Sequence, residues 1–241
     1  MEEENLAPHH LFGFADATEV CSAGSWLLMA KEIINSVQAP IIFVGGTGMY
    51  LSALMNGIAY MPPVLDEIKT QVRQMSDAEI AEQLGADADI NPRRNTRALE
   101  VLLATGKPIK FWHQNQAPHD YHEDDFLTLF MNVSRETLYE RINLRFGKML
   151  EAGAIDEVKK VMEMALDKEL PIMKAIGVPE IIAYLKGEIT LDEATAKSCQ
   201  FSRNYAKRQV TWMSNQIKNK IEVQEMKPQD VYELVKQNIR L

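Results

Sequence analysis

A short glycine turn is the first place where this sequence could do chemistry. Four apolar residues at 41–44 precede Gly45-Gly46-Thr47-Gly48, and a helix-like run continues to Gly57. A strand, a glycine turn and a helix expose backbone N–H groups at a helix N-terminus, where anions bind readily. Thr47 adds a hydroxyl donor, but no Lys-Ser or Lys-Thr follows, as it would in an NTPase phosphate loop. The alternative is a tight turn that holds no ligand.

A cationic stripe is the second candidate. In "ETLYERINLRFGKML" Arg141, Arg145 and Lys148 have the spacing i, i+4, i+7, so a helix places them on one face. Two arginines one turn apart can clamp a diphosphate by paired hydrogen bonds. The alternative is a solvated face on which these cations pair with Glu136 and Glu140.

A third candidate is the stretch "SRNYAKRQVTWM" at 202–213. Helical spacing predicts two faces, with Phe201, Tyr205, Arg208 and Trp212 on one and Arg203 and Lys207 on the other. Arg208 therefore lies on the aromatic side, where a charge needs a partner. It is either a cation aimed at phosphate or a side chain that reaches solvent or stacks on Trp212.

Basic residues also cluster before an apolar helix in "NPRRNTRALEV". Arg93, Arg94 and Arg97 could contact a phosphate backbone and contribute affinity without base specificity. The alternative is a solvated basic helix start. Two histidine pairs, His9-His10 and His119 with His122, lack a convincing third ligand, so no metal site is predicted from them.

Composition and charge bound the class of protein. The chain has 241 residues, 46% of them hydrophobic, which is enough for one large domain or one domain with an insertion. No apolar run is long enough for a transmembrane helix, and the acidic start "MEEEN" has no signal core. Two distant cysteines are typical of a reduced compartment, so we expect a cytoplasmic protein without a membrane. The formal net charge is −8, yet residues 198–220 contain five basic residues and no acid.

The elements that must position these residues follow from hydrophobic spacing and from stop signals. The expected helices are 24–37, 49–56, 65–84, 96–105, 134–151, 155–165 and 178–186, with another that begins near Thr190; the expected strands are 41–44 (buried) and 126–133. This order is typical of an α/β fold with a helical excursion and a short sheet.

Together these segments resemble the tRNA dimethylallyltransferase family. The matching stretches are "PIIFVGGTGMYLSALMNGI", "RALEVLLATGKPI", "RETLYERINLRFGKMLEAGAIDEVKKV", "LPIMKAIGVPEIIAYLKGEITLDEA" and "SRNYAKRQVTWM". Their order and spacing fit over most of residues 8–215. The family transfers a dimethylallyl group from its diphosphate to N6 of the adenosine just 3′ of the tRNA anticodon.

The resemblance implies an α/β fold with a P-loop NTPase-like core, a helical insertion and a mostly helical C-terminal part. Residues 1–62 and 126–241 would form the core, and 63–125 would form an insertion that grips the anticodon stem. Family members begin with a strand, a Walker phosphate loop and an Asp that acts as general base, and none of these matches here. We therefore expect this chain to be inactive or weak by itself.

The resemblance also implies roles for individual residues. Thr47 would contact the target base, and Arg141, Arg145 and Arg208 would bind the diphosphate. The residues expected to bind tRNA are Gly46, Thr47, Lys69, Arg93, Arg94, Arg97, Lys174, Arg203, Lys207 and Arg208.

The remaining expectations concern cofactor, partners and alternatives. Mg²⁺ would be the cofactor, with its ligands outside the matched segments, and the expected partners are the tRNA anticodon stem-loop and dimethylallyl diphosphate. The protein would be a monomer. A shortened protein that binds tRNA without catalysis is one alternative. A nucleotide kinase of the same superfamily is another, disfavoured because the chain has no Walker lysine.

Overall fold

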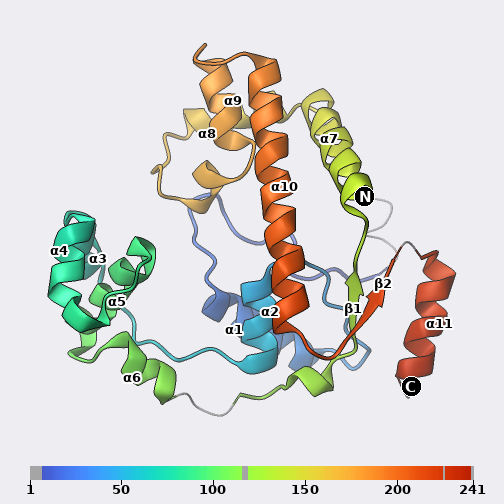
Figure 1. Cartoon of the computed structure of the whole chain (residues 1–241), viewed down its shortest axis with the longest axis horizontal. Coiled ribbons are helices and arrows are strands. Elements are labelled where there is room, and N and C mark those ends of the chain that lie inside the picture. Colours follow the sequence, from blue (N-terminus) through green and yellow to red (C-terminus); the bar gives the residue numbers. More distant parts are fainter. Residues whose placement is uncertain (1–6, 116–118, 225, 240–241) are drawn as a thin grey trace. The chain divides into compact units, whose positions relative to one another are not determined.

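The computed structural model describes residues 7–115, 119–224 and 226–239, and it divides the chain into two compact units (Figure 1). One unit comprises Met1–Ala53 with Glu123–Leu241, and the other comprises Leu54–His122. The first carries the sheet and the long helices, and the second is helical. The predicted insertion at 63–125 overlaps the second unit; its role as a tRNA-binding domain stays a prediction.

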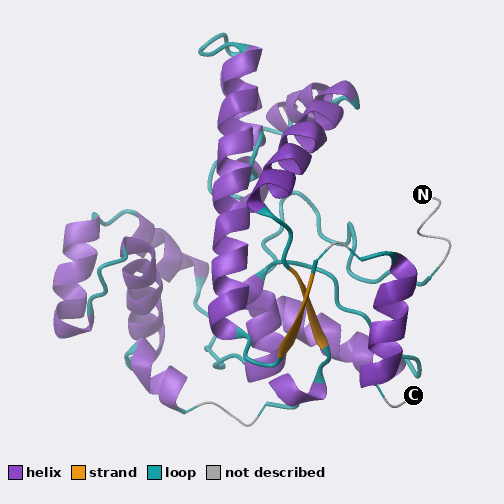
Figure 2. Ribbon diagram, turned by 45° about the vertical axis from the view of Figure 1, so that its right-hand side comes forward, coloured by secondary structure: helices purple, strands orange, loops and turns teal. Residues whose placement is uncertain are grey.

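A small parallel sheet lies in the first unit (Figure 2). Strand β1 (Thr128–Met131) pairs with β2 (Lys220–Val223) in parallel, with Thr128 opposite Lys220 and Met131 opposite Val223. Parallel neighbours need a long crossover, which the helical residues between the two strands provide. The described residues therefore form a mostly helical α/β structure, as predicted.

The predicted buried strand at 41–44 is wrong. Residues 41–47 have no regular secondary structure, and the side chains of Ile42 and Val44 are 84% and 85% exposed. Apolar composition gives a segment the propensity for a strand, but a strand also needs a hydrogen-bonding neighbour. Within the described residues, only β1 and β2 pair as strands, and the 41–44 segment joins neither of them.

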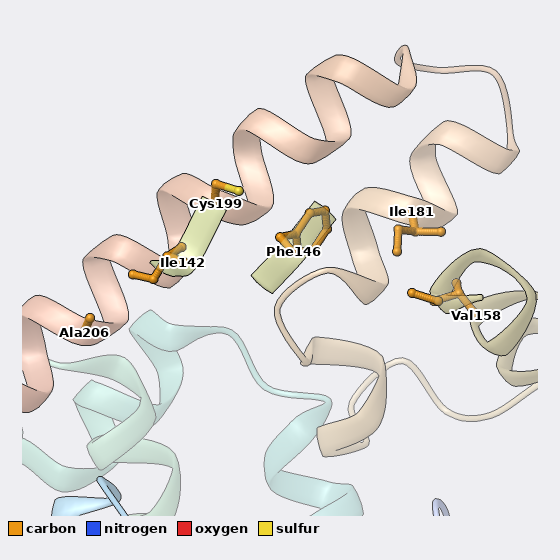
Figure 3. Packing of buried hydrophobic residues seen from close by; sticks show 7 residues of the cluster. Ile142, Phe146, Val158, Ile181, Cys199 and Ala206 are labelled. Carbon is orange, nitrogen blue, oxygen red and sulfur yellow. The ribbon is translucent and has the colours of Figure 1, made fainter. Parts of the chain in front are cut away.

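Helices α7 (Arg135–Glu151), α8 (Ala154–Glu163), α9 (Val178–Leu185) and α10 (Leu191–Gln216) share one apolar core. Its buried members include Ile142 and Phe146 of α7, with Cys199 of α10. Figure 3 shows Phe146 between Cys199 and Ile181 of α9, and Ile142 beside Cys199 and Ala206 of α10. Burying such side chains stabilises a fold by about 1.5–3 kcal/mol each. This core fixes α10 against α7 and α9.

Capping side chains begin the long helices where the sequence predicts. The Ser134 hydroxyl accepts the N–H of Thr137 at the start of α7. Thr190 and Glu193 form a reciprocal capping box at the start of α10. Between these helices Gly177 has φ +102°, and Phe146 Cε2 would lie 3.2 Å from an added Cβ, so only glycine fits there.

The helical unit is built around α5 (Pro92–Thr105). Its other helices are α3 (Asp66–Arg73), α4 (Asp77–Leu84), the short 3-10 turn η2 (Gly85–Asp87) and α6 (Ile109–Gln114). Val72, Ile80 and Leu99 belong to its buried core. The predicted single helix at 65–84 is wrong, because a capping box between Ser76 and Glu79 starts α4 as a new helix.

Helices α1 (Ala23–Ser36) and α2 (Gly48–Asn56) agree with prediction, and Gly57 follows α2 with φ +73°. Short 3-10 turns η3 (Glu123–Asp125) and η4 (Pro171–Lys174) precede β1 and α9. Strand β2 and the helix α11 (Pro228–Asn238) were not predicted. Among the described residues no helix has both the length and the apolar character required to cross a bilayer.

Candidate functional site: a glycine turn beside a cationic groove

The glycine turn, residues Gly45–Gly48, leads directly into α2. The Thr47 carbonyl accepts the N–H groups of Tyr50 at 3.0 Å and Leu51 at 3.3 Å, so Thr47 begins the helix. The Thr47 side chain is exposed, and within the described residues its hydroxyl has no hydrogen-bond partner. The hydroxyl is thus available to a ligand at the start of α2.

Tyr50 anchors α2 to the segment before α1. Its phenol donates to the Cys21 carbonyl at 3.1 Å, and its ring stacks on Trp26 with ring centroids 4.9 Å apart. Burial first, and then the contact with Cys21, raise the pKa of the Tyr50 phenol above its usual value. The phenol therefore stays a donor at neutral pH, and its hydrogen bond anchors α2 near its first residue.

The turn lies against α10, which brings two of the predicted candidates together (Figure 1). A Cβ added at Gly46 would lie 2.8 Å from Gln209 Cδ, and one added at Gly48 would lie 2.6 Å from Trp212 Cε2. Real Cβ atoms do not approach heavy atoms so closely. At Gly48 a side chain would overlap the rigid indole of Trp212, whereas at Gly46 it would meet the end of the flexible Gln209 side chain, which would have to move aside.

An open groove of about 610 Å³ runs along the C-terminal half of α10. Its lining is polar apart from one aromatic ring: Asn204, Lys207, Arg208, Thr211, Trp212, Asn215 and Gln216. Trp212 lines the groove and also contacts Gly48, so the glycine turn lies beside it. Sequence reasoning missed Asn204, Thr211 and Asn215, although the i, i+4, i+7, i+11 spacing that they form with Arg208 could have revealed them.

The groove is cationic. Lys207 and Arg208 form no ion pair with any described carboxylate, and both are exposed. The Arg208 guanidinium lies 5.5 Å from the centre of the Tyr205 ring. The cation–π alternative therefore involves Tyr205 rather than the Trp212 that we considered. A stacked arginine keeps its donors free for an anion.

Arg203 and Lys207, one turn apart on α10, make different contacts. Arg203 turns to α7, where it donates to Asn143 Oδ1 at 2.9 Å, and it also donates to Gln200 Oε1 at 2.9 Å. Its guanidinium lies 5.7 Å from the centre of the Tyr139 ring. Arg203 thus links α10 to α7, whereas Lys207 lines the groove with Arg208.

The cationic stripe of α7 is exposed, but it does not line the groove. Arg141, Arg145 and Lys148 are exposed, and the buried Ile142 and Phe146 lie on the neighbouring face of the helix. The structure therefore places Arg208 at the groove and does not bring Arg141 and Arg145 into its lining. Their joint role on a diphosphate stays a prediction.

The predicted basic residues of the helical unit are mostly paired with nearby acids. Arg94 lies 3.2 Å from Asp89, Arg97 lies 3.1 Å from Glu100, and Lys69 lies 2.8 Å from Asp66. Arg93 is exposed and forms no ion pair with any described residue. Solvent screens such exposed pairs, so they contribute little to stability and a polyanion can replace the acid at little cost.

Two of these acids are held in their charged form. The backbone N–H of Asn91 and the guanidinium of Arg94 keep the pKa of Asp89 below its usual value. The hydrogen bond from Lys69 lowers the pKa of Asp66 in the same way. In the other unit Lys174, a further predicted tRNA contact, pairs with Glu169 at 2.5 Å.

No metal site is apparent in the part of the chain that the structure describes. No three side chains of His, Cys, Asp or Glu converge there. The imidazole rings of His119 and His122 lie 4.6 Å apart, without a third ligand. The described donors therefore do not fit a resident metal ion.

An α/β protein with an unpaired cationic groove and a helix N-terminus beside it has the features of an anion-binding protein. Comparison with known proteins identifies its class. The family model of the IPP transferases matches residues 1–216. A tRNA dimethylallyltransferase of Rhodopseudomonas palustris is 42% identical over 232 residues, which cover 90% of this chain and 72% of the relative.

Solved structures also match this chain. The crystal structure of the tRNA delta(2)-isopentenylpyrophosphate transferase of Staphylococcus epidermidis matches 98% of this chain and 82% of its own, with TM-score 0.65 and 29% identity. A eukaryotic dimethylallyltransferase acting on tRNA shares the fold with TM-score 0.75 at 21% identity, over 98% of this chain and 65% of its own. The chain belongs to the IPP transferase family.

Proposed function

We infer that this chain is a prenyltransferase that modifies tRNA. It transfers the dimethylallyl group of dimethylallyl diphosphate to N6 of the adenosine that is 3′-adjacent to the anticodon. The observation that carries this inference is the family match over residues 1–216, with a tRNA dimethylallyltransferase 42% identical over 90% of the chain. The glycine turn and the α10 groove support it, because the reaction needs sites for an anionic donor and for a positioned base.

The reaction joins N6 of the adenosine to the first carbon of the dimethylallyl group. The bond from that carbon to the diphosphate oxygen breaks, the diphosphate leaves with the electron pair, and the amine loses a proton. Cations that neutralise a leaving diphosphate lower the barrier most, since preorganised charge acts where charge develops. In this chain Arg208 is the groove cation best placed for that role, and Lys207 lies beside it.

We propose that Thr47 contacts the target base and that Gly46 lets the turn approach it. The exposed Thr47 hydroxyl, at the N-terminus of α2 and one residue from the Trp212 contact, supports this role. Arg141 and Arg145 would assist with the diphosphate from α7. Lys207, Arg203 and Lys174 would contact tRNA phosphates in the same unit.

In the helical unit the proposed tRNA contacts are Lys69, Arg93, Arg94 and Arg97. Each is exposed or half-buried, and three of the four have an acid partner that phosphate can displace. Contacts of this kind hold a nucleic acid in register without reading its sequence. We propose that this unit supplies affinity for the anticodon stem.

We also make proposals about the cofactor, the nucleotide-kinase-like core and the cellular setting. Mg²⁺, when bound, would neutralise diphosphate oxygens, but no described carboxylate cluster fits it, so no step is assigned to it. We further propose that the sheet belongs to a P-loop-like core, and that the protein is a cytoplasmic monomer.

Prenyl transfer tests the function directly. Purified chain, Mg²⁺ and labelled dimethylallyl diphosphate are mixed with a tRNA that has an unmodified adenosine 3′ of its anticodon. The controls are the same tRNA with guanosine at that position, and the related Staphylococcus epidermidis transferase. Label in the adenosine tRNA alone would support the proposed function and would overturn the prediction that the chain is inactive by itself.

Lack of label has two distinguishable meanings. If the related enzyme labels the tRNA and this chain still binds that tRNA more tightly than a random RNA of equal length, the chain is a binding protein without catalysis. If it binds both RNAs equally, the proposed anticodon recognition is wrong.

A further inference from the structure

Thr47 lies between two glycines that are both covered by α10. Gly46 lies beneath the carboxamide of Gln209, and Gly48 lies beneath the indole of Trp212. Gln209 and Trp212 are three positions apart on one helix, so one face of α10 covers both neighbours of Thr47. Packing contacts therefore flank the threonine on both sides, in addition to the backbone hydrogen bonds that its carbonyl accepts from Tyr50 and Leu51.

Space, not backbone conformation, accounts for these two glycines. None of Gly45, Gly46 and Gly48 has a positive φ, so other residues could adopt their backbone angles. A Cβ added at Gly45 would meet no atom within 4 Å, whereas Cβ atoms at Gly46 and Gly48 would overlap α10 side chains. The close approach is thus confined to the two residues on either side of Thr47.

The start of α2 is fixed from its other side as well. Tyr50 hydrogen-bonds the Cys21 carbonyl and stacks on Trp26, and its N–H donates to the Thr47 carbonyl. Trp212 meanwhile lines the cationic groove. The exposed Thr47 hydroxyl is therefore held at a fixed position relative to Arg208, by contacts from both α1 and α10.

We propose that Gln209 and Trp212 are positioning residues, which hold the glycine turn so that Thr47 is oriented beside the groove. This inference rests on the proposed function, in which Thr47 contacts the target base. Positioning matters to the rate because a misplacement of about 1 Å can cost on the order of 100-fold in a reaction between two bound groups.

The glycines give a matched set of variants. Gly48→Ala drives a methyl group into the rigid indole, and we expect kcat to fall about tenfold or more while KM for tRNA changes little. Gly45→Ala adds the same methyl group in the same turn without a contact, and we expect a smaller loss. Gly147→Ala, in α7 and also free of contact, controls for the methyl group itself. Equal losses in Gly48→Ala and Gly45→Ala would overturn the proposal.

Hydrogen exchange tests the positioning without any catalysis. In Gln209→Ala and Trp212→Leu, the backbone amides of Tyr50 and Leu51, which donate to the Thr47 carbonyl, should exchange at least about fivefold faster, while the amides of the α7 and α9 core do not. Trp212→Phe keeps an aromatic ring and should restore part of the protection. Unchanged exchange at Tyr50 and Leu51 would overturn the proposal, as would faster exchange with full kcat in an active enzyme.

These two measurements separate the inference from the function. If the unmodified chain transfers no dimethylallyl group, the proposed function fails, and hydrogen exchange alone decides whether α10 holds the turn. If the chain is active, the split between kcat and KM distinguishes lost positioning from lost tRNA binding. A parallel loss of the unfolding midpoint and kcat in Gly48→Ala would indicate a merely structural contact.

Discussion

The cations of the α10 groove and those of the helical unit are held in opposite ways. Lys207 and Arg208 lie in a stretch of the chain without acids and form no ion pair among the described residues. Arg94, Arg97 and Lys69 each pair with a carboxylate within five residues in the sequence. An anion that enters the groove meets uncompensated charge, whereas one that approaches Arg94, Arg97 or Lys69 must displace an acid.

The comparison separates two kinds of anion contact. Uncompensated charge beside a fixed hydroxyl suits a step in which charge develops at one point. Exchangeable surface pairs suit a long phosphate backbone that needs many weak contacts. We therefore expect substitutions in the groove to affect catalysis most, and substitutions in the helical unit to affect affinity and its dependence on salt.

The largest expected effect is that of Arg208→Ala. Removing the groove guanidinium should lower kcat/KM for prenyl transfer by about 100-fold, since one preorganised donor is typically worth that much. The matched control is Arg94 in the helical unit, which pairs with Asp89. Arg94→Ala should change kcat by less than about threefold, because an exposed ion pair contributes little. Steady-state transfer at saturating tRNA measures both. Similar kcat losses for the two variants would break the comparison.

Arg93→Ala should have the next largest effect, on affinity alone. Arg93 has no described acid partner, so removing it should weaken tRNA binding several-fold and reduce the salt slope of binding by about 1. Arg94→Ala should change the slope less, since the phosphate already competes with Asp89. Binding titrations between low and moderate salt give the slopes. A steeper slope in Arg93→Ala than in the unmodified chain would contradict this interpretation.

Lys220→Met tests how the C-terminal end of the groove helix is stabilised. The Lys220 ammonium donates to the carbonyls of Ile217 at 2.6 Å and Ser214 at 3.3 Å, beside the C-terminal end of the groove helix. Losing this charge-assisted cap should lower the free energy of unfolding by about 1–2 kcal/mol. Denaturant unfolding measures it, with Lys218→Met as the control on the neighbouring exposed residue. No difference between the two variants would show that the cap is unimportant.

The smallest expected effect is a pH dependence in the helical unit. The pKa of Asp89 is lowered by the Asn91 N–H and by Arg94, so its contribution to stability is present above the unfolded pKa and is lost as pH falls through the folded pKa. Unfolding midpoints measured from pH 7 to pH 3 should therefore decline slightly more for the unmodified chain than for Asp89→Asn. Identical pH profiles would show that neither the Asn91 N–H nor Arg94 stabilises the Asp89 carboxylate in the folded chain.

Local signals in the sequence placed most helices correctly. Ser134 and Thr190 begin α7 and α10 because their hydroxyls satisfy backbone N–H groups a few residues away, a decision made within one turn. The same local chemistry at Ser76 divided the predicted helix at 65–84, so the missed signal was a capping box that can be read in the sequence. Helix starts of this kind depend little on the rest of the fold.

Local signals could not predict that residues 41–44 form no strand, nor which contacts the α10 cations make. A strand requires a hydrogen-bonding neighbour, which can come from any part of the chain. Helical spacing does not tell which face of α10 meets α7. Arg203 and Lys207 are one turn apart, yet one contacts Asn143 and the other lines the groove.

The sequence by itself determined the family, the helix starts and the residue types that suit diphosphate and tRNA, because motifs and caps act over short distances. Only the tertiary structure decided that α10 covers Gly46 and Gly48 but not Gly45, and that Arg208 belongs to the groove while Arg145 does not line it. The physical reason is that close approach and shared lining arise between segments far apart in the chain, where packing rather than local hydrogen bonding selects the arrangement.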